Sequence, residues 1–391
     1  MKKVGILTHY HNSINYGGVL QAYALCKKIE FLGYECEQID IEFLSEWKNL
    51  NFSRSFIYDY IKKIKFIKKI YIKFSKIKNG KKIKRNKLIR KTWEDSFTKF
   101  SKIIIPHSDE LYNSKTIHTA NGKYDIFVVG SDQVWNPIYY YEPFFLTFVT
   151  NAVPKIAYAA SISQNQLSDN VKKLYSQNLR DFRAISVREE SAVHLLSEIV
   201  DNHIEHVLDP TLLLDKNDWD AITDGRIEKE PYLFCYFLGD DENMRTLAKE
   251  FAIKKQVKLV NICHATGIFH KSDISFGDVS FEAPTPNEFL SLIKYAEYIF
   301  TDSFHASVFS LIYQRQFFVF SRQEFKSMGT RLYSLTLLFN VEDRFCDTID
   351  KVNIQYIEKI IDIDYSRRFD MFEEMKQKSI TYLKNSLAYE P

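Results

Sequence analysis

The sequence has few cysteines and none of the spacings in which cysteine usually binds a metal. Its five cysteines are scattered, odd in number and include no CxxC pair. This pattern is typical of reduced thiols in a cytoplasmic protein, and it excludes the common zinc and iron–sulfur signatures. Because no other cluster of ligand-type residues stands out, we expect no metal site and no cofactor.

Long hydrophobic runs are also missing. No window approaches the roughly 18 uninterrupted apolar residues of a membrane-spanning helix. The apolar run at residues 4–7 is shorter than the roughly 7–15 residues of a secretory signal, and it predicts a first β-strand instead. Walker, HExxH, nucleophile-elbow and complete GxGxxG motifs are absent as well. We therefore expect a cytoplasmic protein that contacts a membrane, if at all, only at the inner surface of the plasma membrane.

The chain has little net charge, since 53 Lys and Arg against 50 Asp and Glu give +3. A nucleic-acid-binding domain is usually strongly basic, so this balance argues against nucleic acid as a partner. The charge is unevenly placed, however. Residues 62–91 hold 15 Lys or Arg and no acid, which leaves −12 on the rest of the chain.

Apolar residues from Ile57 to Ile77 recur at helical spacing, with lysines between them. The pattern predicts a basic amphipathic helix, inserted at about residues 55–92. Two interpretations stay open. The lysines form a solvated helix face, or they attach residues 57–91 to an anionic membrane surface or another polyanion. In the second case each engaged Lys or Arg contributes about 1 kcal/mol.

Short β-branched or aromatic runs alternate with helical patterns along the rest of the chain, which predicts a doubly wound α/β architecture. The predicted strands are residues 4–8, 36–41, 125–129, 156–160, 184–187, 206–208, 232–238, 258–262, 298–301 and 317–320. The predicted helices are residues 19–32, 168–182, 189–199, 242–255, 287–296 and 306–313. The length and a polar linker at 215–230 predict two α/β domains, at 1–216 and 217–365. A closing amphipathic helix at 366–391 is expected to pack back on the first domain.

Two motifs follow predicted strands of the first half. Paired glycines in NYGGVLQ, Gly17 and Gly18, stand where a helix begins, so a ligand has close access to backbone and to free N–H groups. An ordinary turn explains the same letters. The second motif, VVGSDQVWNP, places Asp132 and Gln133 at the carboxyl edge of the sheet, where α/β folds bind ligands. A turn cap is its alternative explanation.

Two further motifs carry candidate charged groups. Arg188, in SVREES, has the geometry to hold a carboxylate or phosphate, although a salt bridge to Glu189 or Glu190 explains it equally simply. His305, in TDSFHAS, stands at a predicted helix N-terminus, where the helix dipole favours the neutral imidazole that a general base needs. Asp302 is the nearby carboxylate expected to counter this effect.

Taken in order, NYGGVLQAYAL, DIFVVGSDQVWNP, VREESA with VLDPTLLL, and EFLSLIKYAEYIFTDSFHASVFSLIY resemble the polysaccharide pyruvyl transferase family. The resemblance spans about residues 4–338. It implies two Rossmann-like domains facing a cleft, similar to the GT-B glycosyltransferase fold. It also implies transfer of a pyruvyl group from phosphoenolpyruvate to a sugar of a surface polysaccharide or its lipid-linked precursor, forming a ketal.

The resemblance carries roles onto individual residues. His305 matches the family's proposed general acid or base, and Arg188 matches an arginine proposed to hold the donor, with Asp302 counted among the catalytic groups. Ser303 stands where some relatives have an arginine, so the expected donor site comprises Arg188, Ser303, Phe304 and Arg331. The expected acceptor site comprises Asn15, Gly17, Gly18, Asp132 and Gln133.

Two other functions remain open at this stage. A GT-B glycosyltransferase using a nucleotide sugar would share the architecture, because a fold does not fix a function. A non-catalytic glycan-binding or membrane-binding protein would use the basic helix as its working part.

Overall fold

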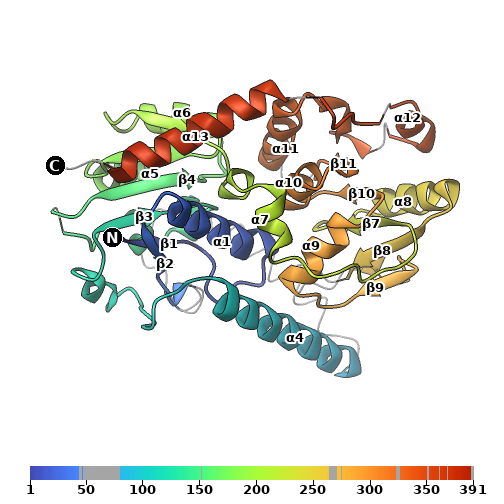
Figure 1. Cartoon of the computed structure of the whole chain (residues 1–391), viewed down its shortest axis with the longest axis horizontal. Coiled ribbons are helices and arrows are strands. Elements are labelled where there is room, and N and C mark those ends of the chain that lie inside the picture. The colour runs from blue at the N-terminus through green and yellow to red at the C-terminus, as the bar shows by residue number, and fades with distance from the viewer. Residues whose placement is uncertain are drawn as a thin grey trace.

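The computed structural model describes residues 1–43, 46, 80–150, 152–263, 271–273, 275–322, 326–349, 352–360, 362–367 and 369–388. Within them, two parallel sheets of six strands each lie side by side (Figure 1). The first sheet has the order β2-β1-β3-β4-β5-β6 and the second β12-β11-β10-β7-β8-β9. The expected fold class, two Rossmann-like α/β units of the GT-B kind, is confirmed.

The strands of the first sheet are β1 (Lys3–Leu7), β2 (Glu35–Gln38), β3 (Ile126–Val129), β4 (Lys155–Ala160), β5 (Ala184–Val187) and β6 (Ile204–His206). Those of the second are β7 (Tyr232–Tyr236), β8 (Lys258–Ile262), β9 (Val279–Phe281), β10 (Tyr298–Thr301), β11 (Gln316–Phe320) and β12 (Phe345–Cys346). In both sheets the strand order reverses at one point, between β1 and β3 and between β7 and β10. Loops part there, at the carboxyl ends of the strands, and leave room for a ligand.

Helices cover the faces of both sheets. Their bounds are α1 (Tyr16–Phe31), α4 (Gly80–Ile104), α5 (Asp169–Leu179), α6 (Glu190–Ser197), α7 (Lys216–Asp220), α8 (Glu242–Lys255), α9 (Pro286–Lys294), α10 (Phe304–Ile312), α11 (Lys326–Leu338), α12 (Ile354–Glu358) and α13 (Asp370–Ala388). Because helices cover both faces, central strands such as β3, β4 and β7 are buried at every position. That is why they appear in the sequence as unbroken apolar runs.

All ten predicted strands are present, with the strand expected at 206–208 displaced to Ile204–His206. Strands β9 and β12 were not predicted, because three and two residues are too short for a periodic pattern. The expected linker at 215–230 begins with helix α7, whose Trp219 is fully buried. The sequence shows no apolar helical pattern for α7, because Trp219 is the buried residue of this short helix and its other residues are polar.

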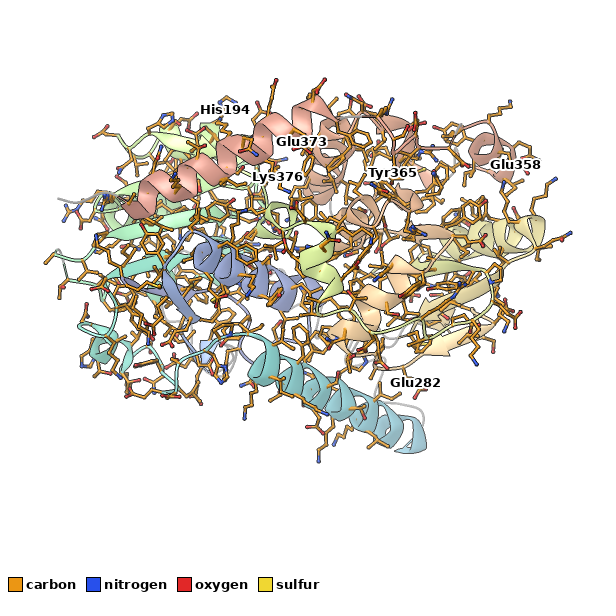
Figure 2. The ribbon with its side chains drawn as sticks, in the orientation of Figure 1. His194, Glu282, Glu358, Tyr365, Glu373 and Lys376 are labelled. Carbon is orange, nitrogen blue, oxygen red and sulfur yellow. The ribbon has the colours of Figure 1, made fainter. Side chains whose placement is uncertain are left out.

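Helix α13 runs from the second half of the chain back across the first sheet, as Figure 1 shows in red. The Ser379 hydroxyl accepts a hydrogen bond from the Leu208 amide at 2.9 Å, and the Tyr382 hydroxyl donates to the Ala157 carbonyl at 2.9 Å. Lys376, labelled in Figure 2, pairs with Asp215 beside α7. The helix thus ties the end of the chain to its first half.

Residues 55–79 of the predicted basic helix, which is most of it, lie outside the described residues. The described part is α4, which buries Ile89, Trp93 and Phe97 along one stripe and exposes Lys87 and Lys91 on the other face. No helix of the described residues is long and apolar enough to cross a bilayer.

Helix α4 also reaches the second half of the chain. The Trp93 indole donates a hydrogen bond to the carbonyl of Glu282, which Figure 2 labels beside this helix, at 2.5 Å. Trp93 lies against Tyr16, which stacks in turn on Phe289 of α9 with ring centroids 4.1 Å apart. These contacts fix the two halves relative to each other next to the first glycine motif.

Candidate active site

The first two motifs meet at the reversal point of the first sheet. The loop after β1 leads to Asn15, whose side chain caps α1 by accepting hydrogen bonds from the amides of Gly17 and Gly18 at 3.0 and 3.4 Å. The loop after β3 begins at Gly130, which has φ +118° and lies against the Tyr158 carbonyl, where a Cβ would come within 2.1 Å. Only glycine fits this position.

Gly17 brings the two halves into direct contact. A Cβ on Gly17 would lie 1.9 Å from Nδ1 of His305, so the imidazole at the start of α10 packs against bare backbone at the start of α1. The glycine motif is therefore needed for the approach of a side chain from the other sheet. Its amides are already occupied by Asn15.

On its other edge, His305 faces a buried carboxylate. Its Nε2 lies 3.6 Å from Oδ2 of Asp209, and the same oxygen accepts a hydrogen bond from Arg188 at 2.6 Å. Thr211 donates both its amide and its hydroxyl to Oδ1. Burial alone would raise the pKa of Asp209, but His305 and Arg188 outweigh it and hold this pKa well below its ordinary value. Asp209 is thus a fixed anion between the histidine and the arginine.

Two arginines flank one aromatic ring. The guanidinium carbons of Arg188 and Arg331 lie 5.2 and 5.9 Å from the ring centroid of Phe304. Both cations also lie near Glu189, at 3.7 and 3.6 Å, and Arg188 lies 3.6 Å from Asp132. Burial, and then the neighbouring Arg188, lowers the pKa of Arg331 from its ordinary value. Two buried guanidinium groups side by side form a site that attracts an anion.

Several polar atoms of this cluster lack a hydrogen-bond partner within the described residues. They are Nε of Arg188, Oε2 of Glu189 and Nε2 of His305, each shielded from solvent. A buried polar atom without a partner costs about 1–3 kcal/mol, so proteins rarely leave three together in one place. Their convergence indicates a place for a polar ligand.

Two cavities adjoin the cluster. The larger, of about 620 Å³, is lined by Arg188, Arg331 and Phe304 together with residues of α6, α11 and α13. The smaller, of about 270 Å³, is lined by Asn15, Asp132 and Gln133 together with residues that follow β1. Ser303 of the expected donor set and Gly17 and Gly18 of the expected acceptor set line neither cavity. The Arg188–Asp132 pair links the two cavities.

A sequence model of polysaccharide pyruvyl transferases matches residues 15–324, from the glycine motif past the histidine motif. The chain belongs to the polysaccharide pyruvyl transferase family. The match includes every expected site residue except Arg331. No curated protein sequence matches.

Several solved structures have a similar fold. A UDP-GlcNAc 2-epimerase from Methanocaldococcus jannaschii has 14% identity and a TM-score of 0.49, over 98% of this chain and 100% of the other. The S. aureus protein MnaA, solved with UDP, has 12% identity and a TM-score of 0.48, over 100% and 99%. The glycosyltransferase SnogD from Streptomyces nogalater has 9% identity and a TM-score of 0.45, over 99% of both chains.

Two expected site residues of this family member make hydrogen bonds that hold the backbone. The carboxylate of Asp302 accepts hydrogen bonds from the amides of Leu238 and Gly239 at 2.7 and 2.8 Å, which ties the ends of β10 and β7 together. Burial raises its pKa, against the opposing effect of Arg322. The hydroxyl of Ser303 caps α10 by accepting from the Ala306 amide at 3.4 Å. The carboxylate beside His305 is therefore that of Asp209, whereas the carboxylate of Asp302 links the ends of β10 and β7.

Sequence reasoning missed Asp209 and treated Glu189 only as a salt-bridge partner. Asp209 lies in VLDPTLLL, where an aspartate before a proline follows the strand β6. That placement at a strand end was the available signal. Asp209 also caps the short turn that follows, by accepting a hydrogen bond from the Thr211 amide.

Proposed function

We propose that this family member transfers a pyruvyl group from phosphoenolpyruvate to two hydroxyls of a sugar, forming a cyclic ketal. The observation that carries the proposal is the pair of buried arginines, Arg188 and Arg331, next to Phe304, with Arg188 linked to His305 through Asp209. Phosphoenolpyruvate carries a carboxylate and a phosphate, and two fixed cations in one cavity match that pair of charges.

The reaction requires the transfer of a proton from a sugar hydroxyl to the donor, with no net uptake of protons. Two sugar hydroxyls each form a C–O bond to C2 of the donor, the C2–O bond to phosphate breaks, and C3 changes from CH2 to CH3. One hydroxyl proton ends on C3 and the other leaves with the phosphate. His305 is the group we assign to this transfer, because its imidazole packs against Gly17 of the opposite half and lies 3.6 Å from Asp209, which also binds Arg188.

Asp209 would have two effects in this scheme. It faces Nε2 of His305 at 3.6 Å, so it orients the imidazole and favours the tautomer with the proton on that nitrogen. It also binds Arg188, so the donor-binding cation and the acid–base group share one anchor. We therefore assign Asp209 a positioning role, exerted through His305 and Arg188.

Incubation with phosphoenolpyruvate and a panel of galactoside and mannosamine acceptors, free and lipid-linked, tests the proposal. We expect phosphate release and a product heavier by one pyruvate less one water. Failure with every acceptor, together with heat protection by a nucleotide sugar but not by phosphoenolpyruvate, would instead favour a glycosyltransferase. Unchanged function in a folded His305→Ala variant would favour a non-catalytic binding protein.

We also propose that the basic segment at residues 57–91 brings the enzyme to the anionic inner face of the plasma membrane, close to a lipid-linked acceptor. The described end of this segment supports the proposal, since α4 exposes Lys87, Lys91 and Leu88 while its opposite stripe packs on the body. Exposed lysines beside an exposed leucine are typical of a helix that binds at a membrane interface.

A further inference from the structure

The two cavities differ in the cations that line them. Arg188 and Arg331 line the larger one, together with the carboxylates of Glu189, Glu190 and Asp209, whereas no lysine or arginine of the described residues lines the smaller one. The smaller cavity has one carboxylate, that of Asp132, and otherwise neutral polar and aromatic groups. An anionic ligand therefore meets guanidinium groups only in the first cavity, and in the second it meets the carboxylate of Asp132 with no lining cation to offset it.

One wall of the smaller cavity is aromatic. The ring of His9 stacks on Phe43 with centroids 4.5 Å apart and an interplanar angle of 9°, and Phe144 meets it edge-on at 4.5 Å. Tyr139 stands across from His9 at 6.4 Å and is 36% exposed. Flat rings of this kind pack against the C–H face of a pyranose, as apolar walls do in most small-ligand sites.

His9 also brings an unpartnered polar atom to this wall. Its Nε2 is shielded from solvent and has no hydrogen-bond partner within the described residues. Burial lowers the pKa of His9 to about 4, so at pH 7 the imidazole is neutral and offers one donor and one acceptor. A hydroxyl group is the natural partner for such a ring.

The smaller cavity also leads to the acid–base group. Asn15 lines it and caps the helix at Gly17, and Gly17 touches His305. On its other side Asp132 lies 3.6 Å from Arg188 of the donor cavity. Residues at the edge of this cavity thus connect it to the candidate acid–base group and to the donor cavity.

We infer that this cavity binds one uncharged pyranose, the terminal residue of the acceptor, with His9 and Tyr139 as the side chains that select it. The inference rests on the proposed function, because the bound sugar is an acceptor only if the protein transfers a pyruvyl group. Its volume of about 270 Å³ suits a single sugar ring, and Asp132 excludes uronic acids and sugar phosphates. None of the aromatic residues was expected from the sequence.

Saturation-transfer NMR on the full chain tests the inference without turnover. The probes are methyl galactoside, methyl N-acetylmannosaminide and methyl glucuronide. We expect at least one neutral glycoside to bind and the glucuronide to bind at least tenfold more weakly. His9→Phe keeps the stacked ring but removes the nitrogens, and Tyr139→Ala removes the facing ring. Each substitution should lower the affinity for the neutral glycoside at least tenfold and leave the affinity for phosphoenolpyruvate unchanged.

His203→Phe is the matched control, because His203 is an exposed histidine that does not line the cavity. Equal binding of the glucuronide, unchanged binding in both cavity variants, or no binding of any neutral glycoside at millimolar concentration would overturn the inference. The proposed function fails separately. If sugar binding depends on His9 but no phosphate is released from phosphoenolpyruvate, the sugar site is supported and the proposed pyruvyl transfer is refuted.

Discussion

Gly17 and His305 touch across the boundary between the two halves of the chain, with no room for a single additional carbon atom between them. The contact joins the start of α1 to the start of α10. It places the imidazole against backbone on one side and against Asp209 on the other. The position of the candidate acid–base group therefore depends on a residue without a side chain in the opposite half.

Gly17→Ala should reduce turnover at least a hundredfold. A Cβ at this position must displace the His305 ring, and a misplacement of about 1 Å at a reacting group costs about that factor. Alanine normally stabilises a helix relative to glycine by about 0.5–1 kcal/mol, so a folded but inactive protein is the expected result. Phosphate release and thermal unfolding measure the two effects. Gly225→Ala is the control, since no atom lies within 4 Å of the added Cβ; full activity in Gly17→Ala would contradict the prediction.

Arg331→Gln should weaken phosphoenolpyruvate binding by about tenfold to a hundredfold. The substitution removes one of two cations beside Phe304 while keeping a polar side chain of similar length, and a hydrogen bond to a charged group contributes about 1.5–3 kcal/mol. Calorimetric titration with phosphoenolpyruvate measures the change. Arg226→Gln, on the exposed stretch after α7, should have no effect. If the two variants bound phosphoenolpyruvate equally well, Arg331 would not be part of the donor site.

Asp209→Asn should lower the free energy of unfolding by about 3 kcal/mol at neutral pH, because it takes the charge from the partner of a buried arginine. The folded-state pKa of Asp209 lies below its unfolded value, so its stabilisation is present above about pH 4 and is lost as the pH falls through the folded pKa. Denaturant unfolding of both proteins should therefore differ between pH 5 and 8 and converge in acid. If the difference in free energy of unfolding between the two proteins stayed constant down to pH 2, the charge of Asp209 would not be its cause.

His9 should make the protein less stable as the pH falls below about 6.5. Burial holds its pKa at about 4 in the folded state, so the unfolded chain binds the proton first. The loss reaches up to about 3 kcal/mol by pH 4, at about 1.4 kcal/mol for each pKa unit. His206, whose pKa burial also lowers, contributes in the same direction. Unfolding of His9→Phe, compared with His206→Phe and the parent between pH 4 and 8, separates the two; an unchanged slope in His9→Phe would refute the assignment.

Neutralising the lysines and arginines of residues 62–91 to glutamine should abolish binding to vesicles that contain anionic lipid and spare turnover on a soluble acceptor. Each basic group near the surface contributes about 1 kcal/mol, and the attraction weakens with salt. Vesicle co-sedimentation at two salt concentrations measures the loss. Lys254→Gln with Lys255→Gln on α8 is the control for general charge. If the neutralised protein still binds vesicles, the lysines are only a solvated face.

The sequence alone determined the strand–helix alternation, because buried parallel strands are short apolar runs and their helices carry a 3.6-residue period. It also placed Arg188, Asp132 and His305 correctly at strand ends, since ligand sites of α/β sheets lie at that edge. The four motifs in order were enough to identify the family. Each of these features depends only on residues near one another in the chain.

The tertiary structure decided which of these groups meet. Asp302 is three residues from His305, yet its carboxylate turns toward the amides after β7, and Asp209 from the other sheet takes the place beside the imidazole. Likewise the ring of His9 becomes a cavity wall only when Phe43, Phe144 and Tyr139 close around it. Local sequence fixes where a side chain leaves the backbone. Its partner depends on how two sheets pack, and no local pattern carries that information.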